Sequence, residues 1–127
     1  MTLTHDGVSI SEAATATGLS THALRYYERA GLMLDPVGRA SSTHRRYGDA
    51  DIAWVQFLTR LRSTGMPIAT IREYTELVRR GDETVGARRE LLVRHRLAVL
   101  RQLDDITASL AAIDFKIAAY EEQEAKA

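Results

Sequence analysis

The C-terminal part of the chain constrains the fold most, because it contains neither proline nor glycine after Gly86. Residues 85–122 are predicted to form one uninterrupted helix, about 55 Å long at 1.5 Å per residue, which exceeds the width of a domain this small. Its apolar residues recur in alternating steps of four and three, the spacing of a coiled-coil seam. They are Val99, Leu103, Ile106, Leu110, Ile113, Ile117 and Tyr120. Burying one leucine or isoleucine side chain is worth roughly 1.5 to 3 kcal/mol. We therefore expect residues 82–127 to pair with a second copy of the chain.

The N-terminal third carries the start and stop signals of two short helices. Ser9 and Glu12 have the spacing of a capping box, and Gly18 suits the end of the helix that follows. Ser20 is placed to cap a second helix over residues 21–30, which the next glycine would terminate. Two short helices joined by a tight turn that contains glycine predict a helix-turn-helix.

Helical periodicity stops over residues 32–48, which are rich in Pro, Gly, Ser and Thr and contain two arginines and a tyrosine just before Gly48. We interpret this stretch as a small β-hairpin wing. A third helix is expected to begin near Asp49, and a fourth, with Pro67 in its first turn, to end at Gly81. The prediction is a mainly α fold, with a winged helix-turn-helix DNA-binding domain over residues 1–81 followed by a coiled-coil dimerisation helix.

Positive and negative charges are equal in number over the whole chain but are distributed unevenly between its two parts. Residues 1–81 hold ten arginines against eight carboxylates, while residues 82–127 hold seven basic against nine acidic groups. A net charge of zero argues against a polycation that coats nucleic acid or anionic membrane without selectivity. The positive bias is confined to the predicted DNA-binding domain, and it is due entirely to arginine.

Several classes of protein are disfavoured by composition. The absence of cysteine excludes disulfides, thiolate metal sites and iron-sulfur clusters. The histidines share no metal-ligand spacing, so neither a metal nor another cofactor is expected; they are His5, His22, His44 and His95. No run approaches the roughly 20 apolar residues of a membrane span, and no signal peptide is evident at the N-terminus, so a cytoplasmic protein is expected. The carboxylates fall at helix caps or on polar faces, which argues against an enzyme.

Arg25 and Tyr26 are neighbours on the predicted second helix, whose other face holds Leu24 and Tyr27. An arginine can bind a phosphate or a guanine edge with two hydrogen bonds, and a tyrosine hydroxyl can donate to a phosphate. The alternative is that Arg25 is a solvated surface charge and that both tyrosines belong to the core. For Tyr27 we adopt the core interpretation.

A second arginine cluster, Arg45 and Arg46 with Arg39 nearby, lies in the predicted wing. Exposed arginines at a hairpin edge can reach phosphates or a narrow minor groove. Charged residues on an edge strand also prevent aggregation, which explains them without DNA. A winged helix-turn-helix would place this cluster and Arg25 on one surface, and their joint presence favours DNA binding.

In their order and spacing these motifs resemble the MerR family of bacterial transcription regulators. The resemblance covers residues 8–81 and is carried by Val8-Ser9-Ile10, Glu12-Ala13, Thr17-Gly18-Leu19-Ser20, Leu24-Arg25-Tyr26-Tyr27-Glu28, Gly31-Leu32, Arg45-Arg46-Tyr47, Asp51-Ile52, Leu61-Arg62, Gly65, Ile68 and Ile71. The wing departs from the family pattern, since Ser42-Thr43-His44 stand where Asn-Gly-Tyr is usual.

The resemblance implies a set of DNA contacts: Thr21, His22 and Arg25 in the major groove, Tyr26 on the backbone, His44, Arg45 and Tyr47 from the wing, and Arg62 on a phosphate. It also implies a homodimer with antiparallel long helices. Such a dimer binds an over-long promoter spacer and distorts the DNA, which realigns the elements that RNA polymerase reads.

The C-terminal sequence resembles the short, aldehyde-responsive branch of the family, which has no separate effector domain, although the cysteine typical of that branch is missing. A small-molecule effector would have to bind between the long helices and the DNA-binding domains. Tyr74, Phe115 and Tyr120 are candidates to line such a site, or are ordinary core and seam residues.

The function predicted from the sequence is therefore that of a transcription regulator that binds double-stranded promoter DNA as a homodimer. The alternative is a helical protein-interaction module without DNA binding. Such a module would use the apolar stripe of residues 103–120 to bind a helix of another protein, and its arginines would serve only to keep it in solution.

Overall fold

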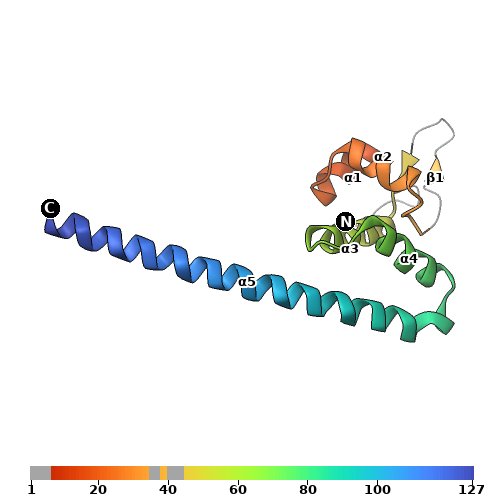
Figure 1. Ribbon diagram of the computed structural model, residues 1–127. Coiled ribbons are helices and arrows are strands. Elements are labelled where there is room, and N and C mark those ends of the chain that lie inside the picture. The colour runs from red at the N-terminus through yellow and green to blue at the C-terminus, as the bar shows by residue number, and fades with distance from the viewer. Residues whose placement is uncertain (1–6, 35–37, 40–44) are drawn as a thin grey trace. The chain divides into compact units, whose positions relative to one another are not determined.

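The computed structural model describes residues 7–34, 38–39 and 45–127 (Figure 1). It divides into two compact units, Met1–Arg89, which we call the head, and Glu90–Ala127, which we call the rod. The described residues are mostly helical, with two strands of two residues each, so the predicted mainly α fold is confirmed. We describe the two units separately.

The two N-terminal helices of the head are α1, Ile10–Thr17, and α2, Thr21–Arg29. The predicted capping box is present, because the amide of Glu12 donates to Ser9 Oγ at 3.2 Å and the amide of Ser9 donates to Glu12 Oε1 at 3.1 Å. Gly18 ends α1 in the left-handed region, at a φ of 75° that favours glycine. Ser20 Oγ accepts from the amide of Ala23 at 3.0 Å and caps α2 as predicted.

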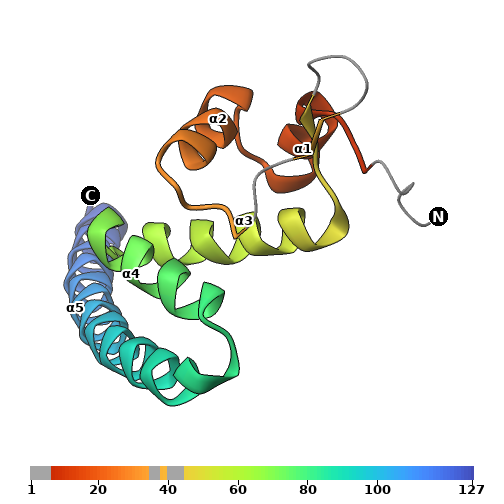
Figure 2. The same cartoon turned by 90° about the vertical axis from the view of Figure 1, so that its right-hand side faces the viewer.

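Helix α3, Asp49–Ser63, lies between the α1–α2 pair and α4, Ile68–Arg79 (Figure 2). It begins near Asp49 as predicted, and Asp51 supports its first turn by accepting from the amide of Gly48 at 2.9 Å. Pro67 is the N-cap of α4, with an extended ψ of 150°, rather than a residue of its first turn as the sequence had suggested. This shift of one position leaves the missing amide of proline harmless, because an N-cap amide makes no helical hydrogen bond.

The chain between α2 and α3 contains β1, Gly38–Arg39, and β2, Arg45–Arg46, which pair antiparallel with Gly38 opposite Arg46. Beyond β2, Tyr47 forms an antiparallel bridge with Val8, with both backbone hydrogen bonds at 2.8 Å. Gly7 precedes this bridge at a φ of 75°, and a Cβ there would lie 2.4 Å from the carbonyl oxygen of Tyr47. The close approach of the two backbones therefore requires glycine at position 7.

The core of the head is formed by side chains from all four of its α-helices and from the segment after α2. The largest side chains with less than 2% exposure are Tyr47, Leu24, Leu32, Leu58, Ile71, Val55 and Thr75. At the α3–α4 contact, the rings of Trp54 and Tyr74 stack with centroids 5.8 Å apart, and Phe57 approaches Tyr74 at the same distance with tilted planes. These helices are therefore held by a continuous aliphatic and aromatic core.

The end of α4 is joined to the next helix by a short 3₁₀ turn, Asp82–Thr84. Thr84 is buried, and its hydroxyl donates to the carbonyls of Leu77 and Gly81. The Arg88 guanidinium donates to the Gly81 carbonyl at 2.8 Å and to Thr84 Oγ1 at 3.2 Å. Thr84 therefore serves the Leu77 carbonyl in the last turn of α4, and Thr84 and Arg88 together serve the carbonyl of Gly81 in the turn that follows.

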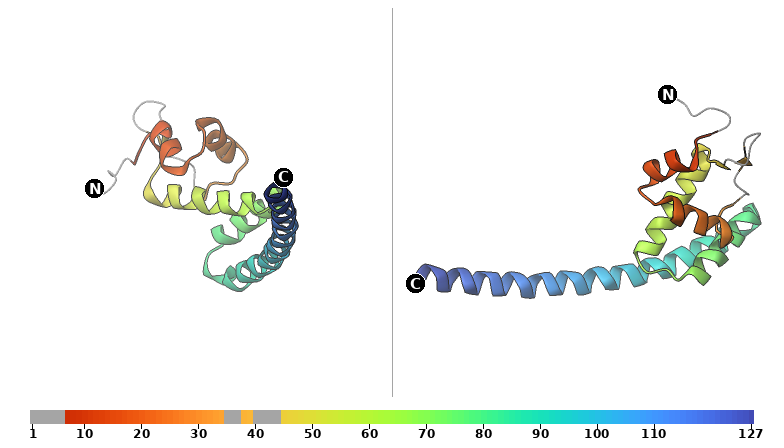
Figure 3. Two further views of the ribbon diagram at one scale, coloured as in Figure 1. Left: turned by 90° about the vertical axis from the view of Figure 1, so that its left-hand side faces the viewer. Right: turned by 90° about the horizontal axis from the view of Figure 1, so that it is seen from above.

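The final helix, α5, runs unbroken over Val85–Lys126, four residues beyond the predicted end (Figure 3). In the rod, the predicted seam is largely uncovered in the single chain. Val99 is half-buried, and the other six seam residues, Leu103 to Tyr120, are 50% to 64% exposed. None of the helices in the described part of the chain is long and apolar enough to cross a membrane.

Candidate nucleic-acid interface

Helix α2 has one face inside the head and one face in solvent. Leu24 and Tyr27 are buried, which confirms the core interpretation of Tyr27. His22 and Arg25, two of the residues assigned to the major groove, are exposed, and Thr21 in the first turn is half-buried. The helix therefore presents a polar, cationic face whose position is fixed by the apolar face behind it.

Tyr26 and Arg62, assigned to the DNA backbone from different helices, lie against each other. The guanidinium carbon of Arg62 on α3 is 5.8 Å from the centre of the Tyr26 ring, within the range of a cation–π interaction. The Tyr26 ring also packs against Tyr27 with a centroid distance of 6.3 Å. Arg62 is exposed, so its remaining donors face solvent next to the surface of α2. The fold therefore brings together two residues that are 36 positions apart in the sequence.

The structure describes only some of the residues assigned to the wing. His44 lies outside the described residues, and Arg45 is described as part of the backbone of β2 alone. Tyr47 differs from the sequence expectation of a DNA contact, because its side chain is 1% exposed and its hydroxyl donates to Glu28 on α2. A tyrosine in the core cannot reach a phosphate without leaving its packing, so the structure gives Tyr47 a structural role instead.

Three side chains that the sequence analysis did not single out hold the segment that follows α2. Arg72 Nε donates to the carbonyl of Ala30 at 3.0 Å, and Trp54 Nε1 donates to that of Leu32 at 2.7 Å. Arg79 donates to the carbonyls of Gly31, Met33 and Leu34. Five consecutive carbonyls therefore accept hydrogen bonds from side chains of α3 and α4. The sequence signal for this arrangement is weak, because arginines at positions 72 and 79 are also typical of an exposed helix face.

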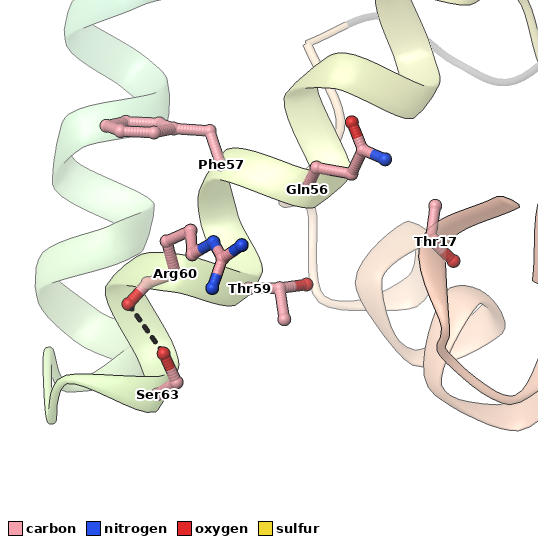
Figure 4. A pocket seen from close by; sticks show the side chains of 6 residues that line it. All are labelled: Thr17, Gln56, Phe57, Thr59, Arg60 and Ser63. Atoms are coloured by element: carbon pink, nitrogen blue, oxygen red, sulfur yellow. Dashed lines mark hydrogen bonds between the residues drawn. The ribbon is translucent and has the colours of Figure 1, made fainter.

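A shallow groove of about 550 Å³ lies between the end of α1 and the outer face of α3 (Figure 4). Gln56 crosses it and donates to the carbonyl of Ala16 at 3.4 Å, while Phe57 points to the side of α3 away from Thr17. The lining residues are Thr17, Gln56, Phe57, Thr59, Arg60 and Ser63. This set contains no carboxylate and no histidine, so it offers neither an acid–base pair nor a set of metal ligands.

The residues considered for an effector site fall in different units. Tyr74 is part of the aromatic cluster of the head, and burial raises the pKa of its hydroxyl, although the positive charge of Arg88 opposes this shift. Phe115 and Tyr120 belong to the rod and are 76% and 57% exposed. In the parts of the chain that the structure describes, no three or more acidic, histidine or cysteine side chains are grouped as a metal site would require.

The head therefore defines a class of protein: a small helix-turn-helix module with a cationic helix face, followed by a long helix with an unpaired apolar stripe. Comparison with protein families agrees with this description. Residues 8–77 match the MerR helix-turn-helix family of regulatory proteins, and residues 52–123 match the MerR DNA-binding region. The chain belongs to the MerR family.

Similar proteins are found among bacterial regulators. The transcriptional regulator AdhR of Bacillus subtilis is 42% identical over 89 residues, which make up 70% of this chain and 63% of AdhR. A helix-turn-helix transcriptional regulator of Haemophilus influenzae is 34% identical over 117 residues, covering 92% of this chain and 84% of the relative.

Among solved structures, HiNmlR, a MerR family regulator lacking the sensor domain, has been crystallised bound to promoter DNA. It superposes with a TM-score of 0.83 at 31% identity, covering 98% of this chain and 94% of HiNmlR. A MerR family regulator from Listeria monocytogenes gives the same TM-score at 36% identity, covering 91% of this chain and 86% of that one.

Proposed function

We propose that two copies of this chain form a homodimer that binds one promoter duplex and distorts it to control transcription. The observation that carries the proposal is the combination of a cationic face on α2 with an apolar stripe on α5 that a single chain leaves exposed. Nothing in this role requires catalysis, and we expect the protein to act in the cytoplasm. Binding of HiNmlR to promoter DNA, and its similarity over nearly the whole chain, support the proposal.

In the proposed complex, α2 is the recognition helix and enters the major groove. Arg25 and His22 are exposed on it and can donate hydrogen bonds to base edges or phosphates, and Thr21 would add a contact from the first turn. Tyr26 and Arg62 would meet the DNA backbone as a pair, since the Arg62 guanidinium stacks on the Tyr26 ring. His44 and Arg45 would add contacts from the wing.

We propose that the stripe on α5 is the dimer interface and that the two helices pair antiparallel, as the resemblance to the family implies. The positions that flank the stripe are mostly polar, including Gln102 and Lys116 on one edge and Asp114 and Glu121 on the other, so the apolar surface is narrow, as a two-helix seam requires. Pairing would bury roughly one apolar side chain per helical turn on both copies, each worth roughly 1.5 to 3 kcal/mol. Dimerisation also doubles the number of arginines that can contact one duplex.

Doubling these contacts matters because distorting DNA is costly. Bending a site of 20 to 30 base pairs costs on the order of 1 to 10 kcal/mol, and phosphate contacts from two subunits must offset that cost. In exchange, a distorted spacer changes the relative orientation of the two promoter elements that RNA polymerase reads. The polymerase would then sense the regulator through the shape of the DNA.

The test is a titration of the wild-type protein against a duplex that carries the region upstream of its own gene, repeated over a series of salt concentrations. Arg25→Ala and Arg45→Ala should each lower the affinity and reduce the slope of log affinity against log salt by about one for each phosphate that is no longer neutralised. The control is Arg80→Ala, an exposed arginine at the end of α4 that pairs with Glu83 at 3.7 Å.

Footprinting on the same duplex locates the binding site relative to the polymerase elements. A protected region centred on the spacer between those elements is the expected result. If the wild-type protein fails to bind this duplex at low salt, or if it binds every duplex equally, the proposed function is wrong and the protein-interaction alternative gains support.

A further inference from the structure

The segment that leaves the recognition helix, residues 30–34, is held by its backbone. It lies outside the helices and strands, yet each of its five carbonyls accepts a hydrogen bond from Trp54, Arg72 or Arg79. Of these carbonyls, those of Leu32 and Met33 belong to buried residues, where a carbonyl without a partner is costly, and those of Ala30, Gly31 and Leu34 lie nearer to solvent. The side-chain donors therefore take the place that hydrogen bonds of a helix or strand would have. Leu32 and Met33 of this segment are also buried in the core.

Arg79 contributes more of these bonds than either other side chain. Its Nε donates to the Leu34 carbonyl at 3.1 Å, and its Nη2 donates to the carbonyls of Gly31, at 3.1 Å, and Met33. Its Nη1 forms an ion pair with Glu76. All three nitrogens of the guanidinium are therefore engaged inside the head, and a planar fork is the side chain best suited to several acceptors at once.

Arg72 lies two helical turns before Arg79 on the same face of α4, and it donates to the carbonyl of Ala30, the C-cap of α2. The chain is also held directly after β2, at Tyr47. There Tyr47 is bridged to Val8 and donates its hydroxyl to Glu28 on α2. The part of the chain that carries β1 and β2 is therefore anchored at both ends, and α4 provides the anchor at the end nearer to α2.

We infer that Arg79, assisted by Arg72, is a positioning residue for DNA binding: it fixes the path of the chain from the recognition helix to the wing without contacting DNA. This inference depends on the proposed function, because it assumes that α2 and the wing bind one duplex. Loss of Arg79 should leave the contacts of α2 largely intact and should misplace those of the wing.

The test is a double-mutant cycle between Arg79→Met, which keeps most of the aliphatic stem, and Arg45→Ala in the wing. On the salt series, Arg79→Met should lower the affinity by about tenfold and reduce the salt slope by about as much as Arg45→Ala does, although Arg79 touches no phosphate. The double variant should lose no more slope than either single variant. Arg80→Met, at the adjacent exposed position, is the matched control and should behave as wild type.

Two results would overturn the inference while leaving the proposed function intact. If the slope reductions of Arg79→Met and Arg45→Ala add in the double variant, Arg79 contacts a phosphate itself. If Arg79→Met only lowers the melting temperature and binds with wild-type slope, its role is structural. Should Arg79→Met not fold, as judged by circular dichroism, Arg79→Lys replaces it in the cycle, because a compact ammonium group lacks the planar fork whose separate nitrogens reach the three carbonyls. Failure of the wild-type protein to bind would count against the proposed function instead.

Discussion

The head and the rod differ in how far the apolar side chains of their main apolar clusters are buried within one chain. In the head, side chains such as Leu58 and Ile71 are fully buried by contacts within one chain. In the rod, Ile106 and Leu110 have the spacing of a core but remain more than half exposed. The head therefore has its core within a single subunit, whereas the apolar stripe of the rod would form a core only with the proposed second copy. This difference predicts that the stability of the head does not depend on protein concentration. The structure of the rod, in contrast, should depend on protein concentration.

The largest effect is expected from a charge in the middle of the stripe. Leu110→Glu removes an apolar contact and places a carboxylate on the proposed interface in both copies, so dimer affinity should fall at least about 100-fold. Light scattering at micromolar concentration should show a monomer. The matched control is Phe115→Glu, because Phe115 is 76% exposed and lies on the side of α5 opposite the stripe. A dimeric Leu110→Glu variant, or a monomeric Phe115→Glu variant, would contradict the assignment of the seam.

The next effect is expected from a cavity in the head. Leu58→Ala should lower the free energy of unfolding by about 2 to 5 kcal/mol, because Leu58 is fully buried on α3. Chemical denaturation followed by Trp54 fluorescence measures it. The loss should be the same at low and high protein concentration, unlike the effect of Leu110→Glu. The control is Arg60→Ala, because the side chain of Arg60 is exposed on the same helix. This variant should change the free energy of unfolding by less than about 0.5 kcal/mol.

A smaller effect is expected at the first helix of the head. Ser9→Ala removes the acceptor of the Glu12 amide and should cost about 1 kcal/mol. Ser11→Ala is the control, since Ser11 is exposed within α1 and its hydroxyl does not cap the helix. Equal stabilities of the two variants in denaturant titrations would show that the capping box contributes nothing to the head.

The smallest effect is expected from pH. Burial raises the pKa of Tyr74, so the folded head holds this proton more tightly than the unfolded chain, whose tyrosine titrates near 10. Stability should therefore be constant at neutral pH and should decrease as the pH rises past about 10. In Tyr74→Phe this contribution is absent, so unfolding midpoints measured between pH 9 and 11 should fall less steeply than in the wild type. Parallel curves for the two proteins would contradict it.

Features encoded by neighbouring residues were predictable from the sequence. The capping box at Ser9, the Ser20 cap and the left-handed Gly18 each depend on a few adjacent positions, and all three are present. The long helix was predictable for the same reason, because nothing after Gly86 interrupts it. The helix extends past its predicted end at residue 122, because residues 123–126 contain no signal that stops a helix.

Features that depend on distant residues were not predictable in this way. Tyr47 is adjacent to two arginines, which favoured a DNA contact, but its environment is set by Glu28 and Val8, 19 and 39 positions earlier. Arg79 has acceptors 45 to 48 positions away, and no local pattern identifies a carbonyl as the partner of an arginine. The contact of Arg62 with Tyr26 is of the same kind. The proposed DNA contacts remain predictions that the salt series can test one by one.

The way residues 30–34 are held has a consequence for redesigning the target preference of such a regulator. Every acceptor in that stretch is a main-chain oxygen, which persists whichever amino acid is installed, so replacing Ala30 or Leu34 leaves the attachment to α4 chemically unchanged. Mutagenesis libraries can therefore extend from α2 into these two positions, provided that the donors on α3 and α4 are kept constant.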